Sequence, residues 1–251
     1  MKRLISFGTL IALAVLPALL LLLPGEALAQ ALTFDLGAET AGTTTGRILQ
    51  LIILITILSL APSILVMMTS FTRIVVVLSF LRTAMGLQQT PPNSVVVSLA
   101  LFLTAFVMMP TLEAVYDEAL EPLIAEDITE FEALDRAQGP VRTFMLGHVR
   151  ENDLRLFLDL TDTQEVEAPE ATPMRALIPA FMISELRRAF EIGFLLFLPF
   201  LIIDMVVASI LMSMGMMMLP PVMISLPFKL IFFVLVDGWY MVAGSLVQSY
   251  G

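Results

Sequence analysis

The stretch LMSMGMMMLPP, residues 211–221, separates two strongly apolar runs and ends in two consecutive prolines. Proline lacks the backbone N–H that a helix interior needs, so we expect the chain to bend here. Five of the seven residues from 212 to 218 are methionine, whose unbranched and polarizable side chain adapts to irregular partners. We interpret the stretch as a soft apolar bend that could close a pore and still yield, if it is repeated around an oligomer axis. Ordinary packing between membrane helices is the alternative interpretation.

The composition is that of a membrane protein. Hydrophobic residues make up 58% of the chain, charged residues make up 14%, and the mean hydropathy is +0.93. The net charge of -10 is concentrated, because residues 113–175 hold 16 of the 23 acidic residues but only 5 of the 13 Lys and Arg residues. This acidity argues against nucleic acid as a partner. Cysteine is absent, which excludes disulfides, thiolate metal sites and cysteine nucleophiles.

Residues 1–29 have the three parts of a secretory signal peptide. Basic residues 2–3 precede an apolar run to Leu23, and Ala27-Leu28-Ala29 is a small-x-small cleavage site. We expect cleavage after Ala29, and an uncleaved membrane anchor is the alternative. The following leader, residues 30–46, is rich in Gly and Thr and is predicted to be flexible.

Four long apolar segments follow, and their lengths fit two helical hairpins. The segments are residues 48–68, 95–109, 192–218 and 222–236. We assign the first hairpin to residues 47–112, with Arg73 and Arg82 in its turn region, and the second to residues 179–251, with the Met-rich bend. Between them lies an acidic extramembrane region, residues 113–178. With the mature chain beginning outside, the arginines fall on the cytoplasmic side, in agreement with the positive-inside rule.

Proline and charged residues interrupt these apolar segments. The interrupting residues are Pro62, Pro199, Asp204, Pro227 and Lys229. Helices broken in this way are tolerated where they are buried in protein, not where they face lipid. We therefore predict an all-α fold of membrane-associated hairpins, broken at prolines, that contact neighbouring subunits.

The charges within the apolar segments need partners. A charged side chain at the bilayer centre costs roughly 2.5 to 3.5 kcal/mol on insertion scales, so Asp204 and Lys229 are predicted to pair within or between subunits. Arg150 and Glu185 are further candidates for such an interface network, because each lies in a partly apolar helix without an obligate local partner. A proton relay through Asp204 is the functional alternative, since isolated membrane carboxylates can mark ion paths.

The acidic region is predicted to be helical. Thr111 or Thr129 can start a helical turn, and Gly139-Pro140 is expected to break the helix. After that break, apolar residues recur at near-helical spacing over residues 145–160 with charged residues between them, which predicts one amphipathic helix.

Catalytic constellations are missing from the sequence. The single histidine, His148, has no second imidazole with which to share a metal, and we expect it at a surface or interface. We find no phosphate-binding Gly-rich loop, zinc-binding helix or nucleophile elbow. The sequence therefore does not predict an enzyme, and it predicts neither a metal nor a cofactor.

Several motifs, taken in order, resemble the FliP family of flagellar biosynthesis proteins. They are PSILVMMTSFTRI (62–74), LQQTPPN (87–93), PAFMISELR (179–187), GMMMLPP (215–221), LPFK (226–229) and VDGW (236–239). The resemblance covers the chain from about residue 47 to its last residue. The signal sequence and the long leader favour the flagellar family over its virulence-secretion relatives.

This resemblance implies a role that composition does not show. FliP-like proteins form a homo-pentameric ring which, with FliQ and FliR, makes the flagellar type III export gate within the basal body. Unfolded rod, hook and filament subunits pass through this gate across the bacterial inner membrane. An ion-coupled transporter or proton-conducting subunit that uses Asp204 is the alternative, although we detect no inverted repeats.

The resemblance also implies roles for individual residues. By similarity, the pore gasket is formed by Met216, Met217 and Met218, and Phe144 looks like an aromatic plug of the closed lumen. Four further residues match positions of inter-subunit ion pairs: Arg150, Glu185, Asp204 and Lys229.

Overall fold

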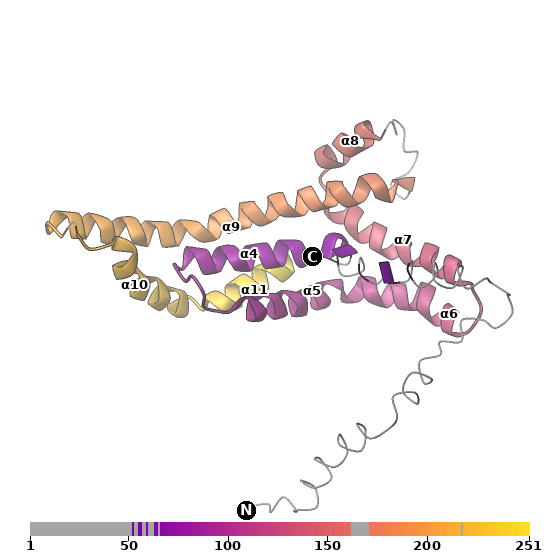
Figure 1. Cartoon of the computed structure of the whole chain (residues 1–251), viewed down its shortest axis with the longest axis horizontal. Helices are drawn as coiled ribbons and strands as arrows, with labels where there is room; N and C mark the ends of the chain where they lie inside the picture. Colours follow the sequence, from indigo (N-terminus) through magenta and orange to yellow (C-terminus); the bar gives the residue numbers. More distant parts are fainter. Residues whose placement is uncertain are drawn as a thin grey trace, which may run out of the picture. The chain divides into compact units, whose positions relative to one another are not determined.

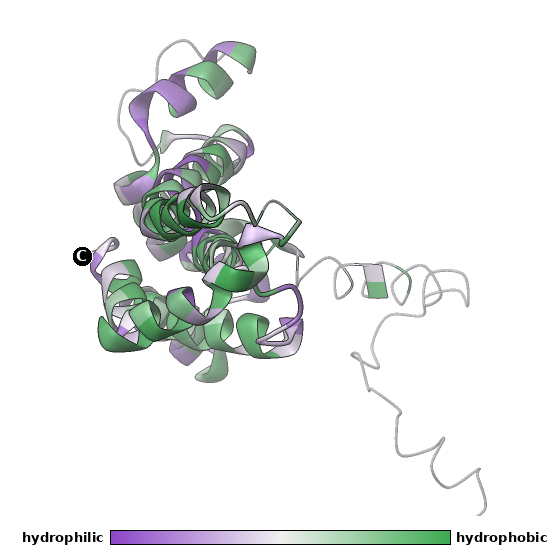
Figure 2. Cartoon of the chain, turned by 90° about the vertical axis from the view of Figure 1, so that its left-hand side faces the viewer, coloured by the Kyte–Doolittle hydropathy of each residue, from purple (hydrophilic) through white to green (hydrophobic). Residues whose placement is uncertain are grey.

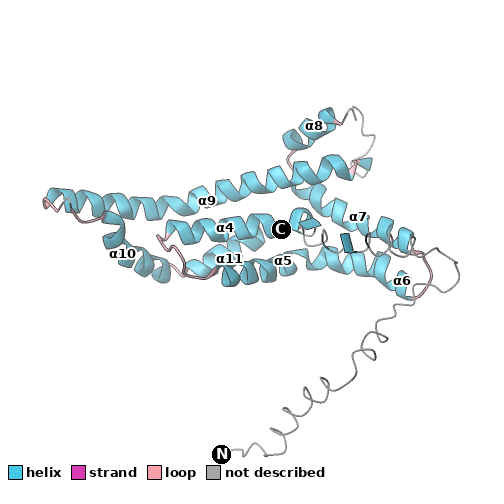
Figure 3. Cartoon of the chain, viewed as in Figure 1, coloured by secondary structure: helices cyan, strands magenta, loops and turns pink. Residues whose placement is uncertain are grey.

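The computed structural model describes residues 66–161, 171–216 and 218–251, together with six separate positions between 52 and 64. The predicted signal peptide, the leader, most of the first apolar segment and Met217 lie outside the described residues. Helices account for the regular structure, and no strand occurs in the part described (Figure 3), which confirms the all-α prediction. The elements are α4 (Phe71–Ala84), α5 (Asn93–Val115), the π-helical turn η1 (Tyr116–Leu120), α6 (Glu121–Ile124), α7 (Glu130–His148), α8 (Glu151–Leu160), α9 (Met174–Ser213), α10 (Pro221–Leu235) and α11 (Gly238–Gln248).

The 40-residue helix α9 organises the helices around it, because α4 lies along its middle and α7 and α8 contact its first half (Figure 1). Ile74 and Val77 of α4 are fully buried in the core that α4 shares with α5, α9, α10 and α11. A Cβ atom on Gly193 would lie 2.7 Å from the Phe80 ring, so glycine permits the close approach of α4 and α9. A second, smaller core joins α7 to α9 through Met145 and Phe181.

Glycine, not proline, ends α9 within the methionine-rich bend. Gly215 has a φ of 74°, a left-handed conformation that favours glycine. Its N–H donates to the Met212 carbonyl at 3.1 Å, and the Met216 N–H donates to the Leu211 carbonyl at 3.0 Å. This pair of bonds is a Schellman motif. The predicted bend is therefore present, but Pro221 begins α10 and does not terminate α9.

The expectation that Arg73 and Arg82 lie in a connecting turn was wrong. Both residues belong to the helix α4, and the turn comes later, at Gly86, which has a φ of 78°. The N–H of Gly86 donates to the Thr83 carbonyl, and the N–H of Leu87 donates to the Arg82 carbonyl, so α4 ends in the same motif as α9. The sequence interpretation assigned these residues to a turn because Arg73 and Arg82 lie near the two ends of α4, and charged residues are typical of loops.

The expected break at Gly139-Pro140 was also wrong, because α7 continues through it to His148. Packing overrides the proline here, since Met145, one turn later, is fully buried against α9. The predicted amphipathic helix over residues 145–160 is instead divided between α7 and α8. At the division, Val149 is extended and the Arg150 N–H donates to Ser184 Oγ of α9 at 3.0 Å.

Thr129 begins α7, as one of the two predicted helix starts, whereas Thr111 lies inside α5. Its hydroxyl accepts a bond from the Glu132 N–H, and its own N–H donates to Glu132 Oε2 at 3.0 Å, which forms a capping box. This backbone bond, and a second one from the Thr129 hydroxyl, lower the pKa of the Glu132 carboxyl.

Two of the described helical stretches are long and apolar enough to cross a membrane: Asn93–Ile124 and Met174–Ser213. They contain the predicted segment at residues 95–109 and most of the one at 192–218. The bent pair α10 and α11, which meet at 62°, would be a third span if the pair crosses as one unit. Apolar residues dominate the helices (Figure 2), and only 6% of the most apolar 18-residue stretch of α9 is buried within the chain. A large apolar surface is therefore open to lipid or to other subunits.

Candidate functional site

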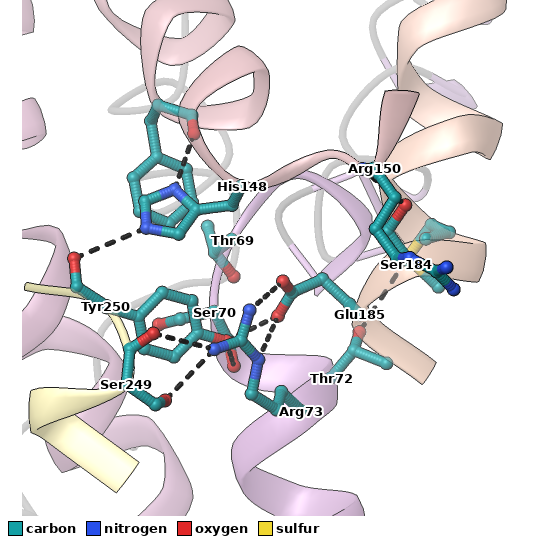
Figure 4. Close-up of polar contacts among 12 residues, drawn as sticks. Thr69, Ser70, Thr72, Arg73, His148, Arg150, Ser184, Glu185, Ser249 and Tyr250 are labelled. Atoms are coloured by element: carbon teal, nitrogen blue, oxygen red, sulfur yellow. Dashed lines mark hydrogen bonds and ion pairs between the residues drawn. The ribbon is translucent and has the colours of Figure 1, made fainter. Parts of the chain in front are cut away.

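A fully buried ion pair joins α4 to α9 at the centre of the candidate site (Figure 4). Arg73 Nε donates to Glu185 Oε2 at 3.0 Å, and Arg73 Nη2 donates to the other carboxylate oxygen. Both side chains are at most 1% exposed. The pairing is bidentate, which suits the planar guanidinium and satisfies two of its donors at once. The pair therefore ties the first turn of α4 to the first half of α9.

The residues that follow α11 complete this network. We call Ser249, Tyr250 and Gly251 the tail segment. Arg73 Nη1 donates to the Ser249 carbonyl at 3.2 Å and to Ser249 Oγ at 3.0 Å. The Arg73 guanidinium carbon lies 3.7 Å from the centre of the Tyr250 ring, a cation–π geometry. The tail segment thus covers one face of the buried pair.

The Tyr250 hydroxyl is a further donor to the buried carboxylate. It donates to Glu185 Oε2 and lies 3.4 Å from the Ser70 carbonyl. Burial, followed by the negative charge of Glu185, raises the pKa of the Tyr250 phenol, so the hydroxyl keeps its proton and can donate. The Glu185 carboxylate consequently accepts bonds from two different helical regions.

The end of α7 packs onto the other side of the tail segment. The Phe144 and Tyr250 rings are stacked with centroids 6.1 Å apart, and the His148 ring lies 5.1 Å from that of Tyr250. One ring nitrogen of His148 is 2.7 Å from the Phe144 carbonyl oxygen, and the other is 3.3 Å from the Tyr250 carbonyl oxygen. Phe144 also contacts Phe181 of α9, edge to face, at 5.9 Å. The sequence placed His148 at a surface or interface, and it is half-buried in this aromatic cluster.

Arg150 lies beside the network but does not join the ion pair. Its backbone N–H bonds Ser184 Oγ, and that hydroxyl donates to Asp153 Oδ2 at 2.7 Å. One guanidinium nitrogen of Arg150, Nη1, is buried without a hydrogen-bond partner among the described residues. A buried donor in that position has capacity for an acceptor from outside the chain.

Asp204 and Lys229 form a second ion pair, between α9 and α10. Lys229 Nζ lies 2.6 Å from Asp204 Oδ2 and also donates to the Ala84 carbonyl at 3.2 Å. Ser225 Oγ donates to the other Asp204 oxygen. The Lys229 side chain is 3% exposed and that of Asp204 is 24% exposed. The two predicted intramembrane charges therefore meet within one chain.

The methionine-rich bend exposes its side chains. Met218 is 99% exposed, Met214 and Met216 are also exposed, and Met217 lies outside the described residues. A cavity of ≈ 530 Å³ lies elsewhere, between α5, η1 and α7, and includes Phe144 and Arg142 in its wall. In the described part, His, Asp and Glu side chains form no group of three that could hold a metal ion.

The structure brings some of the predicted site residues together and leaves others apart. Glu185 and Arg150 lie in one cluster, near Phe144. Asp204 and Lys229 lie in a second cluster. The predicted gasket methionines belong to neither cluster. Pairing of these charges between subunits stays a prediction. The sequence interpretation missed Arg73 and Tyr250 as partners of Glu185. The available signal was the position of Arg73 directly before the apolar run at residues 74–78, since a charge that is drawn into a core requires a buried partner.

Comparison with known proteins places these sites in a family context. A model of the FliP family matches residues 54–246. A flagellar biosynthetic protein FliP of Caulobacter vibrioides is 60% identical over 230 residues, which cover 91% of this chain and 86% of the relative. Proteins of the same name from Bacillus subtilis and Aquifex aeolicus are 55% and 54% identical, cover 80% of this chain, and are themselves covered to 91% and 85%.

Proposed function

The chain belongs to the FliP family, and on this premise we propose that it is a pore-forming component of the flagellar type III protein export gate. In this role it passes unfolded flagellar subunits across the cytoplasmic membrane without catalysing a reaction. The observation that supports the proposal most strongly is the family match over residues 54–246, which includes both buried ion pairs and the methionine-rich bend. The long apolar helices support a place in a membrane.

We propose the bacterial inner membrane and the flagellar basal body as its location, with the acidic region, residues 113–178, on the periplasmic side. The predicted signal peptide supports this orientation, because the mature chain then begins outside the cytoplasm. Arg73 is not available as a flanking charge for the positive-inside rule, because it is buried in an ion pair. Arg82, which is partly buried at the end of α4, still is.

We further propose a homo-pentameric ring that assembles with FliQ and FliR family proteins and other export-apparatus components. The apolar surface of α9, which the chain itself barely covers, supports extensive contacts with other subunits. We propose ion pairs across such contacts for Arg150, Glu185, Asp204 and Lys229. The unpartnered Arg150 nitrogen supports this proposal for Arg150, whereas Glu185 and Lys229 are buried against partners in the same chain.

Native mass spectrometry of the gate complex, purified in detergent with its neighbouring export-apparatus proteins, tests the assembly. We expect a mass that contains five copies of this chain together with two different small membrane partners. A chain that purifies alone as a monomer, with export intact, would contradict the ring.

The gate mechanism follows from the chemistry of the bend. Met216, Met217 and Met218 are proposed to form a thioether gasket, and Phe144 a plug, around the pore. The exposure of Met216 and Met218 leaves them available to such a ring. Thioethers are flexible and apolar, so they can exclude water and ions and then deform around an extended polypeptide. Gly215 follows the end of α9 and precedes these methionines, and Pro221 begins α10 after them.

Replacing Met216, Met217 and Met218 with alanine tests the gasket. We expect the complex to assemble at normal yield but to raise membrane ion conductance severalfold during export, because alanine cannot fill the constriction. Met241→Ala, at an exposed methionine of α11, is the matched control. Unchanged conductance in the triple variant would argue against the gasket.

The alternative of a proton-conducting subunit is less well supported. Asp204 is held by Lys229 at 2.6 Å and by Ser225, as expected for a structural ion pair.

A further inference from the structure

We propose that the tail segment is the element that positions the Phe144 plug, with Tyr250 as the positioning residue. This inference rests on the proposed function, in which Phe144 closes the pore. The structure shows Tyr250 between two parts of the chain: the buried pair on one side and the end of α7 on the other (Figure 4).

The tail segment is anchored to a rigid base. Arg73 and Glu185 are buried and bound to each other in a bidentate geometry, on two helices that share the main core. Arg73 bonds Ser249, and the Tyr250 hydroxyl bonds Glu185. Charge-assisted bonds of this kind are roughly twice as strong as neutral ones. The position of the Tyr250 ring is therefore set by the pair.

The ring and backbone of Tyr250 set the position of α7. The ring stacks on that of Phe144, and the Tyr250 carbonyl oxygen faces a ring nitrogen of His148, the last residue of α7. His148 in turn contacts the Phe144 ring, at 4.6 Å between centroids, and its carbonyl oxygen. Phe144, His148 and Tyr250 thus form one aromatic cluster whose position is transmitted from the ion pair.

The tail segment can part from α7 while it stays attached to α11, because the N–H groups of Ser249, Tyr250 and Gly251 bond carbonyl groups in the last turn of α11. It follows the last turn of α11, and its attachments to Arg73, Glu185 and α7 are hydrogen bonds and ring contacts. Movement of Phe144 away from a closed lumen requires its ring to part from Tyr250 or to carry Tyr250 with it. The tail segment therefore keeps Phe144 in its closed position.

Hydrogen–deuterium exchange of the intact export complex tests this inference with a readout that is independent of gating. In Tyr250→Ala, we expect the amides of residues 141–148 to exchange roughly three- to tenfold faster, the effect of losing an aromatic contact. Tyr250→Phe keeps the ring and should show at most half of that increase on a logarithmic scale. Tyr240→Ala, at an exposed tyrosine of α11, should leave α7 unchanged.

Three results would overturn the inference. The first is an unchanged exchange rate of α7 in Tyr250→Ala. The second is an equal increase in Tyr240→Ala, because the effect would then not be specific to Tyr250. The third is an equal rise in α10, residues 221–235, which would indicate global destabilisation.

Ion conductance separates this inference from the proposed function. If Phe144 is the plug, Phe144→Ala and Tyr250→Ala should both raise ion leak through the resting gate. Faster exchange of α7 in Tyr250→Ala, without ion leak in Phe144→Ala, would support the conclusion that the tail segment positions α7. It would contradict the role of Phe144 as the plug. Ion leak in Phe144→Ala together with an unchanged exchange rate of α7 in Tyr250→Ala would support Phe144 as the plug and contradict the role of the tail segment.

Discussion

Glu185→Ala is expected to lower the free energy of unfolding by about 3–5 kcal/mol, the range for a buried ion pair that loses one partner. Arg73, fully buried, would keep its charge but lose both carboxylate contacts, and Tyr250 would lose its acceptor. The expected result is a large drop in thermal stability of the detergent-purified protein, measured by intrinsic fluorescence, with little assembled complex and little export.

The same helix offers a matched control for this variant. Glu191 pairs with Arg187 at 3.0 Å, but both side chains are more than half exposed. Glu191→Ala should change stability by less than about 0.5 kcal/mol, as for exposed helix pairs. If the two alanine variants lose equal stability, the Arg73–Glu185 pair does not have the proposed role. The double variant Arg73→Met/Glu185→Leu should recover part of the loss, because no charge is then buried alone.

Asp204→Ala is expected to have the second-largest effect, and to act on assembly more than on transport chemistry. Lys229 is 3% exposed and would keep only the Ala84 carbonyl as its partner. Because Asp204 is partly exposed, we expect the loss of stability to lie near the lower end of about 3–5 kcal/mol. The yield of the native complex and its melting temperature measure the effect.

A double-mutant cycle distinguishes a structural pair from a proton relay at this site. Combining Asp204→Ala with Lys229→Met should cost much less than the sum of the single changes, because the pair acts as a unit. Normal complex yield and stability in Asp204→Ala, together with lost export, would instead favour the proton-conducting alternative. Ser209→Ala, at an exposed serine of α9, controls for a change on the same helix.

The apolar helices could be predicted from the sequence because hydropathy is a sum over neighbouring residues. The segments at 95–109 and 192–218 fall largely within the observed stretches Asn93–Ile124 and Met174–Ser213. The bend at residues 211–221 was likewise predicted correctly, although Gly215 and not a proline ends α9. Family membership was also accessible, because several short motifs in a fixed order are far more specific than any one of them.

The breaks and the charges were less predictable. Pro140 looks like a helix break in isolation, yet α7 continues because Met145 is buried against α9. Arg73 looks like part of a connecting turn, since an isolated charge is costly to bury. It is buried because its acceptor, Glu185, lies 112 residues further along the chain.

The sequence by itself determined the all-α class, the apolar character of the long helices, the methionine-rich bend and the family. These features depend on local composition, periodicity and residue order, which can be read without knowledge of the tertiary contacts. Only the tertiary structure decided which buried charges meet, and that Tyr250 lies between the Arg73–Glu185 pair and Phe144. The physical reason is that the cost of a buried charge or aromatic ring is set by its partners, and here those partners come from distant parts of the chain.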